Sequence, residues 1–229
     1  MENFFVGIFM IIIVLTIISG GLSAPTATNT PITSATQSTP VKNQETPISQ
    51  NPTQNSTIQT VGKEGEIVVE SSSLPSGLFI QSSSTRATFL EIQISARGSD
   101  IDVQRIKVNL GSSTAGSNFS HKVASRIYIL GNGYNVLASS LLNANTVNRE
   151  SVGGTNIYTI TLTNFHLSVP KDTTRILSVA FDIYPVIDSI YRTSYTVSID
   201  ANGVRAIDGA NINHTAPKST ISRYQTVVE

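Results

Sequence analysis

Apolar and polar residues alternate along most of the chain beyond residue 64. Leu90, Ile92 and Ile94 are separated by Glu91 and Gln93. Because successive side chains of a strand point to opposite faces, the first set is expected to face a core and the second to face water. The same period of two predicts further strands at residues 106–110, 126–130, 134–137, 156–163, 177–183, 195–199, 204–207 and 221–228. In this region, no stretch carries a sustained apolar pattern at helical spacing.

Turn residues separate these alternating stretches. Gly131-Asn132-Gly133 lies between two of them, and Asn-Gly between apolar runs predicts a hairpin with a type I′ turn, whose two central residues need positive φ. Asn202-Gly203 and Asp208-Gly209 end two others. Roughly eight to ten short strands with turns between them predict an all-β fold. Since no crossover helices are expected, we predict an antiparallel β-sandwich over residues 64–229.

The first 24 residues have a different pattern. Residues 4–18 are almost wholly apolar, and residues 4–24 carry no charge. A span of about twenty apolar residues crosses a bilayer as a helix. We therefore predict a single transmembrane helix, or a cleaved signal peptide, within residues 1–24, with the membrane as partner of residues 4–24. Pro25 makes cleavage after Ala24 a poor site and favours an uncleaved anchor. Cleavage after Gly21 or Ser23 keeps the secreted alternative open.

Residues 25–63 are rich in Thr, Ser, Pro, Gln and Asn, and their apolar residues are isolated. Such a segment cannot bury enough surface to offset the entropy of ordering it, so we predict a disordered, semi-stiff stalk. Ser/Thr-rich tracts with Pro are typical of glycosylated stalks. The chain also has glycosylation sequons at Asn55, Asn118 and Asn213.

Composition narrows the possible partners. The chain has no cysteine, which excludes disulfides, thiolate metal sites and cysteine nucleophiles. Its 15 basic and 15 acidic residues give a formal net charge of zero, and the basic residues are scattered singly. Binding to a nucleic acid duplex needs several clustered phosphate contacts, so nucleic acid is not an expected partner.

Three stretches resemble a repeat of bacterial cell-surface and surface-layer-like proteins. They are residues 89–108, residues 125–133 and residues 167–179, the last with a Val-Pro-Lys turn that leads into a long strand. The resemblance spans about residues 66–210. It implies an immunoglobulin-like β-sandwich, an extracellular structural or adhesive role, and no catalytic residues. The chain departs from these proteins in having one copy on a stalk instead of a tandem array, which leaves an array-forming role in doubt.

Few residues suggest chemistry. His121, His166 and His214 form no HExxH motif, and no GxSxG nucleophile motif occurs, so we do not expect an enzyme or a cofactor. Acidic residues lie at predicted strand ends, and Asp100 and Asp102 are the candidates for a Ca²⁺ ligand set. Ordinary turn capping is the alternative for both. The candidates for stacking on a ligand are three tyrosines, with strand packing as the alternative for each: Tyr134, Tyr191 and Tyr195.

These predictions together describe a protein of the cell surface, anchored or secreted, with a structural or adhesive role. Its partners would be the membrane and other surface proteins or glycans. One alternative is a domain that binds a glycan or peptide through loops distant from the stalk. Another is a subunit that polymerises by strand addition, in which residues 221–229 or 66–71 pair with the sheet edge of a neighbour.

Overall fold

The computed structural model describes residues 59–229. The predicted membrane segment at residues 4–24, the predicted stalk up to residue 58 and the sequon at Asn55 lie outside the described residues. Within residues 59–229, no helix is long and apolar enough to cross a bilayer.

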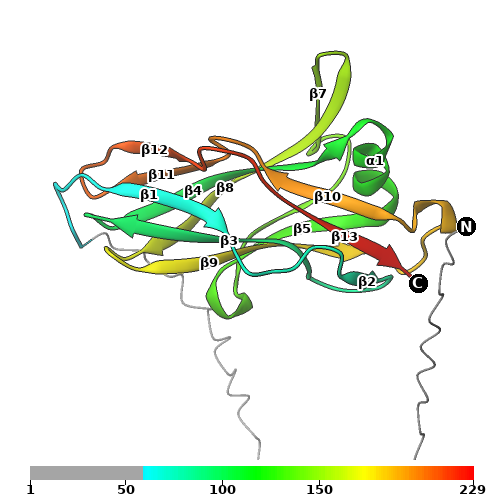
Figure 1. The fold of residues 1–229 in the computed structure, drawn as a ribbon, viewed down its shortest axis with the longest axis horizontal. Helices are drawn as coiled ribbons and strands as arrows, with labels where there is room; N and C mark the ends of the chain where they lie inside the picture. The colour runs from blue at the N-terminus through cyan, green and yellow to red at the C-terminus, as the bar shows by residue number, and fades with distance from the viewer. Residues whose placement is uncertain (1–58) are drawn as a thin grey trace, which may run out of the picture. The chain divides into compact units, whose positions relative to one another are not determined.

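The described part of the chain is built mainly from strands (Figure 1). Their bounds are β1 Glu66–Ser71, β2 Phe79–Gln81, β3 Ala87–Arg97, β4 Ile101–Ser112, β5 Ala124–Leu130, β6 Val136–Leu141, β7 Asn148–Val152, β8 Thr155–Val169, β9 Thr174–Ile183, β10 Ser194–Ile199, β11 Val204–Asp208, β12 Asn213–Ala216 and β13 Ile221–Val228. The short helical segments are α1 Ser113–Asn118, a π-helical turn Phe119–Val123 and 3₁₀ turns at Asn132–Tyr134 and Ser189–Tyr191. Each strand inferred from the alternating pattern overlaps one of these strands, although the one predicted at residues 134–137 begins only at Val136.

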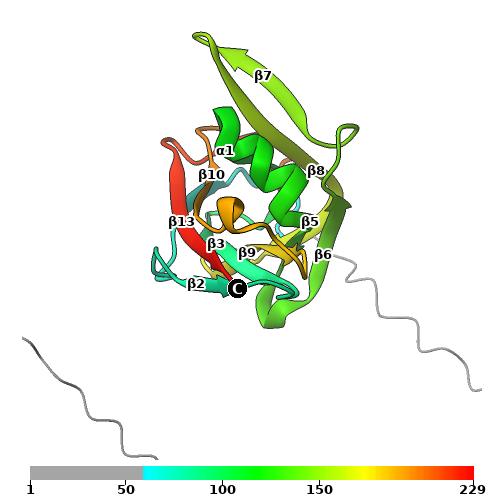
Figure 2. The ribbon, with the colours of Figure 1, turned by 90° about the vertical axis from the view of Figure 1, so that its right-hand side faces the viewer.

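The strands form two sheets. The first has the order β1-β3-β9-β5-β6, and the second has the order β12-β11-β4-β10-β13-β2, with β8 paired to β4 and β7 paired to β8. Seen from one end, the sheets face each other, and the hairpin of β7 and β8 projects from the body (Figure 2). This arrangement confirms the predicted all-β sandwich.

Pairing within the sheets is antiparallel at all but one place. β2 runs parallel to β13, with Phe79 opposite Thr226 and Gln81 opposite Val228. The prediction of purely antiparallel pairing is wrong there. The physical reason is that the chain leaves the first sheet after β1 and crosses through residues 72–78 to the second. It therefore reaches the edge of the second sheet while still running in the direction of β13.

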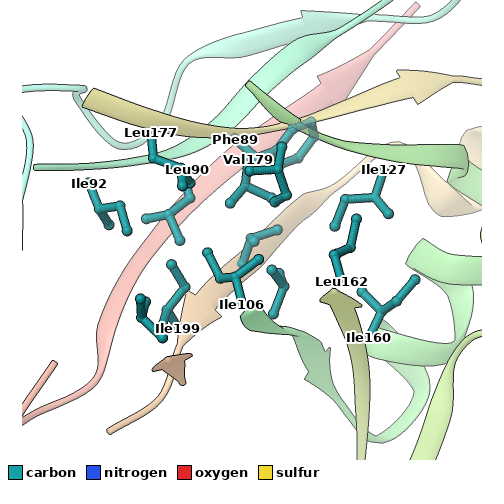
Figure 3. Packing of buried hydrophobic residues seen from close by; sticks show 14 of the residues in the cluster. Phe89, Leu90, Ile92, Ile106, Ile127, Ile160, Leu162, Leu177, Val179 and Ile199 are labelled. Carbon is teal, nitrogen blue, oxygen red and sulfur yellow. The ribbon is translucent and has the colours of Figure 1, made fainter. Parts of the chain in front are cut away.

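The core lies between the sheets. Leu90, Ile92 and Ile94 of β3 are fully buried, as the alternation predicted. Leu90 and Ile92 face residues of the second sheet such as Ile106 and Ile199 (Figure 3). An aromatic cluster closes one part of this core, with ring centroids 5.0–5.2 Å apart, and consists of Phe89, Phe119, Phe181 and Tyr195. One continuous core therefore joins both sheets.

The β5–β6 hairpin forms as predicted, but with a different turn. Leu130 pairs with Val136, so five residues link the strands. Positive φ angles occur at Gly133 and Tyr134, and Asn132 is not among the residues with positive φ. The predicted two-residue type I′ turn at Asn132-Gly133 is therefore wrong. The Asn132 side chain instead accepts a hydrogen bond from the N–H of Ile176 in β9, a contact that only the assembled sheet provides.

Helix α1 and the π-helical turn after it had no signal in the apolar pattern. α1 begins after Gly111, whose φ is 104°, and Gly116 of α1 packs so closely on Gly111 that a Cβ at residue 116 would overlap the Gly111 carbonyl. The π-helical turn delivers Phe119 to the aromatic cluster. Tertiary contacts therefore hold this short segment in helical form.

Candidate functional site

A β-bulge shapes the outer face of the second sheet. Val103 of β4 pairs with Leu167 of β8, and Arg105 pairs with Thr163, so only Gln104 stands opposite residues 164–166. Val103 and Ile106 are buried, while Gln104 and Arg105 between them are both partly exposed. Against β11, Arg105 pairs with Arg205 and Val103 pairs with Ala206, so Gln104 is the extra residue of a bulge in β4. Bulges re-aim side chains, and here Gln104 and Arg105 both emerge on one face.

These residues line an open hollow of about 320 Å³. β4 contributes Gln104 and Arg105, and β11 contributes Arg205. The remaining lining comes from one stretch of β8: Thr163, Asn164, Phe165 and His166. Asn164 has a φ of 60°, a conformation that asparagine tolerates better than most residues. The hollow is therefore walled by amide, hydroxyl and cationic groups.

Two guanidinium groups meet at this hollow. Arg105 and Arg205 are direct partners in the register of β4 and β11. Arg205 donates two hydrogen bonds to Asn213 Oδ1, 2.9 Å from Nε and 2.7 Å from Nη2. The Nε of Arg105 is buried and has no acceptor among the described residues. The Asn213 amide therefore fixes one arginine, while the other keeps an unused donor.

Beside the arginines lies a carboxylate–imidazole pair. Asp102 Oδ2 is 2.7 Å from His166 Nδ1 and accepts a hydrogen bond of 3.0 Å from Gln104 Nε2. Asp102 Oδ1 is buried and has no donor among the described residues. The Asp102 side chain is almost fully buried, whereas His166 is mainly exposed. This pair joins residues 64 positions apart, and no spacing in the sequence indicated it.

Asp100, the other calcium candidate, binds backbone N–H groups. Its Oδ2 accepts hydrogen bonds from Gln59 and Thr60, and its Oδ1 accepts one from Lys171. Burial raises the pKa of Asp100, but these hydrogen bonds outweigh it and hold the pKa below the usual value. Among residues 59–229, no group of three or more His, Asp or Glu side chains is placed to hold a metal ion. The structure uses Asp100 to hold the start of the domain, separately from the contacts of Asp102.

A second buried carboxylate, Asp208, acts at the same junction. Its oxygens accept hydrogen bonds from the N–H groups of Gly65, Ala210 and Ile212, and from His214 Nε2 at 2.9 Å. Burial raises the pKa of Asp208, but the hydrogen bonds, with His214 the strongest, lower it to about 2. Sequence reasoning missed this role, because the Asp208-Gly209 pair indicated only a turn.

The three tyrosine candidates are not equivalent. Tyr195 is only 2% exposed and its hydroxyl donates to the carbonyl of Tyr191, so its ring lies in the core and is removed from the stacking candidates. Burial, aided by Tyr191, raises the pKa of Tyr195 to about 12. Tyr134 is 69% exposed on the β5–β6 turn, where it lines a second hollow of about 340 Å³ with Glu91 and Asn132. Tyr191 lies in the 3₁₀ turn just before β10, where it is partly buried and packs against the core.

The described sequons also differ. Asn213 is exposed on the short outer strand β12. Asn118 is partly buried at the end of α1, and the hydroxyl of Ser120 in its sequon is buried and donates to the Gly116 carbonyl. Asn213 is therefore the more accessible of these two.

The two segments expected to take part in strand addition already have partners. β13 lies between β10 and β2, so both of its edges are paired. β1 is an outer strand that pairs with β3 over six residues. Donation of β13 to a neighbour would require these pairs to break, whereas β1 could add a strand on its outer side.

Comparison with known proteins gives little further information. No family model and no curated protein matches the chain. Among solved structures, a cohesin module of a family 33 glycoside hydrolase from Clostridium perfringens is 14% identical, with a TM-score of 0.27, covering 71% of this chain and 96% of that one. MyfA, the major subunit of Myf fimbriae from Yersinia enterocolitica, is 8% identical, with a TM-score of 0.22, covering 72% and 99%. Similarity at this level carries no weight in assigning a function.

Proposed function

We propose that this chain is a surface-displayed domain with a structural or adhesive role and no catalytic step. The observation that carries the proposal is the placement of the two ends of the described domain. Residues 59–65 join at one end of the long axis, and Glu229 lies at the other (Figure 1). This placement suits display, because the end of the described domain that carries Glu229 lies away from the point at which the chain enters it.

The junction itself is built to hold the incoming chain. Asp100 binds the N–H groups of Gln59 and Thr60, and the Thr60 hydroxyl is 2.7 Å from Ser99 Oγ. The N–H of Gly62 donates to the Gly209 carbonyl at 2.6 Å. These contacts fix the point at which the chain enters the domain. The immunoglobulin-like class of sandwich, the membrane anchor and the extracellular location are part of the proposal.

Protease treatment of intact cells tests the location. Protease added outside should remove the domain, detected with an antibody against residues 59–229, while a cytosolic marker in the same cells survives. Lysed cells serve as the control that the domain can be cut. A domain that stays protected on intact cells would refute surface display. The intact mass of the protein from the membrane fraction then separates the anchored form, which starts at Met1, from the cleaved form.

A further inference from the structure

The hollow on the second sheet concentrates positive charge that the fold compensates only in part. Arg105 and Arg205 stand directly opposite each other, and like charges in that position destabilise a sheet. The ion pairs found among residues 59–229 involve other cations, and neither arginine takes part in one. An acidic residue at position 105 or 205 would instead have formed an ion pair across the two strands. The two arginines therefore reduce the stability of the fold, and stability alone does not explain them.

The unused donor of Arg105 has a further cost. Its Nε is buried without an acceptor, and a buried unpaired polar group costs about 1–3 kcal/mol. Asp102 is the acidic residue of the same strand. His166 and Gln104 occupy its Oδ2, its Oδ1 is buried without a donor among the described residues, and neither oxygen accepts a hydrogen bond from either guanidinium. Asp102 therefore offsets part of the charge without satisfying the arginines.

We propose that this hollow binds the oxyanion group of an acidic polysaccharide, either a carboxylate or a sulfate. A guanidinium suits such oxyanions, because it carries several N–H donors that form charge-assisted hydrogen bonds with them. In Arg205, Nε and one N–H of Nη2 donate to Asn213, so the remaining N–H groups of Nη1 and Nη2 would serve the ligand. Arg205 is held in place by Asn213, which reduces the entropy lost on binding. The neighbouring groups of Gln104, Thr163 and Asn164 suit sugar hydroxyls, since they can both donate and accept hydrogen bonds.

A titration with defined polymers tests this site. The full chain, in a neutral detergent and made in a host that does not glycosylate Asn213, is titrated by calorimetry with polygalacturonate, dextran sulfate and neutral dextran. We expect at least one acidic polymer to bind and neutral dextran not to bind. Arg105→Gln and Arg205→Gln should each weaken binding at least tenfold, and the double variant should abolish it.

Two controls keep the result specific. Arg175→Gln in β9 of the other sheet removes the same charge and should leave binding unchanged. The melting temperature of Arg105→Gln should be equal to or above that of the wild type, because the variant relieves the repulsion and the unpaired donor. Equal binding by the double variant and the wild type would overturn the proposal, as would absence of binding to both acidic polymers.

Titrations with small anions distinguish a site for a polysaccharide from a site for free anions. Free galacturonate and inorganic sulfate, titrated alone, should bind at least a hundredfold more weakly than the corresponding polymer unit. Binding of the free ions as tightly as the polymers would refute a polysaccharide site. This inference does not require surface display: binding measured in detergent can fail while the protease test succeeds, and the reverse also holds.

Discussion

Asp208 shows how one buried side chain can hold several segments together. It accepts hydrogen bonds from three backbone N–H groups and from His214, and it has no exposed side-chain surface. Asp208→Asn replaces one acceptor oxygen by a donor that faces these N–H groups. We expect a loss of about 3 kcal/mol of unfolding free energy at pH 7, measured by urea denaturation.

The pH dependence of that loss follows from the lowered pKa. The folded pKa of Asp208 is about 2, below the usual value of 3.8, so its charge stabilises the fold above about pH 4. The contribution, on the order of 2 kcal/mol, is lost as pH falls from about 5 towards 2. The gap between wild type and Asp208→Asn should therefore narrow on acidification. Asp172→Asn, at an exposed position, is the control and should show a small gap at all pH values.

Phe119 gives a second prediction at the residue scale. It is fully buried and its ring contacts those of Phe89, Phe181 and Tyr195. Phe119→Ala leaves a cavity, so we expect roughly 3–5 kcal/mol of destabilisation in urea unfolding. Tyr134→Ser, on the exposed turn, should change stability by less than about 0.5 kcal/mol. A cost below about 1 kcal/mol for Phe119→Ala would contradict its place in the core.

At the scale of elements, the glycines of two turns are expected to be required for different reasons. A Cβ at Gly209, between β11 and β12, would overlap the Thr60 carbonyl, so Gly209→Ala should displace residues 59–62 from the domain. A Cβ at Gly154, in the turn of the β7–β8 hairpin, meets no atom, but its φ is 81°. Gly154→Ala should cost only about 1 kcal/mol of backbone strain.

Hydrogen exchange separates these two effects. Backbone amides of residues 59–62 should exchange faster in Gly209→Ala, while those of β3 and β9 keep their protection. In Gly154→Ala, faster exchange should be confined to β7 and the neighbouring part of β8. Unchanged exchange at residues 59–62 in Gly209→Ala would show that the junction does not hold the incoming chain as described.

At the scale of the whole molecule, the outer strands bear on self-association. β2 and β12 are short, and β1 and β7 carry charged residues, features that hinder edge pairing. β6 is the exception, because its six residues carry no charge and Leu141 is half exposed. We expect residues 25–229 to be monomeric in light scattering at high concentration.

If that protein associates, the contact should involve β6. Ser139→Glu places a charge on this strand and should restore the monomer, whereas Ser151→Glu on β7 should not. Oligomers that persist in both variants would instead support strand addition at another edge, such as the outer side of β1.

The amino-acid sequence by itself determined the class of fold and most of the strands. Leu90, Ile92 and Ile94 alternate with polar residues, and alternation at period two is a local property that the burial in the folded chain only confirms. Short helical segments and the turn after β5 were not predictable in this way. Gly116 packs on Gly111, and Asn132 bonds to Ile176, so their conformations depend on partners from other elements.

Only the tertiary structure decided where the functional groups meet. Arg105 and Arg205 are far apart in the sequence, and they become neighbours because β4 and β11 pair in one particular register. The bulge at Gln104, between the pairs Arg105–Arg205 and Val103–Ala206, then turns Gln104 and Arg105 to the same face. Register and bulges depend on long-range pairing, since a shift of one residue would reverse every side chain. Local patterns therefore define the strands, and long-range pairing defines the site.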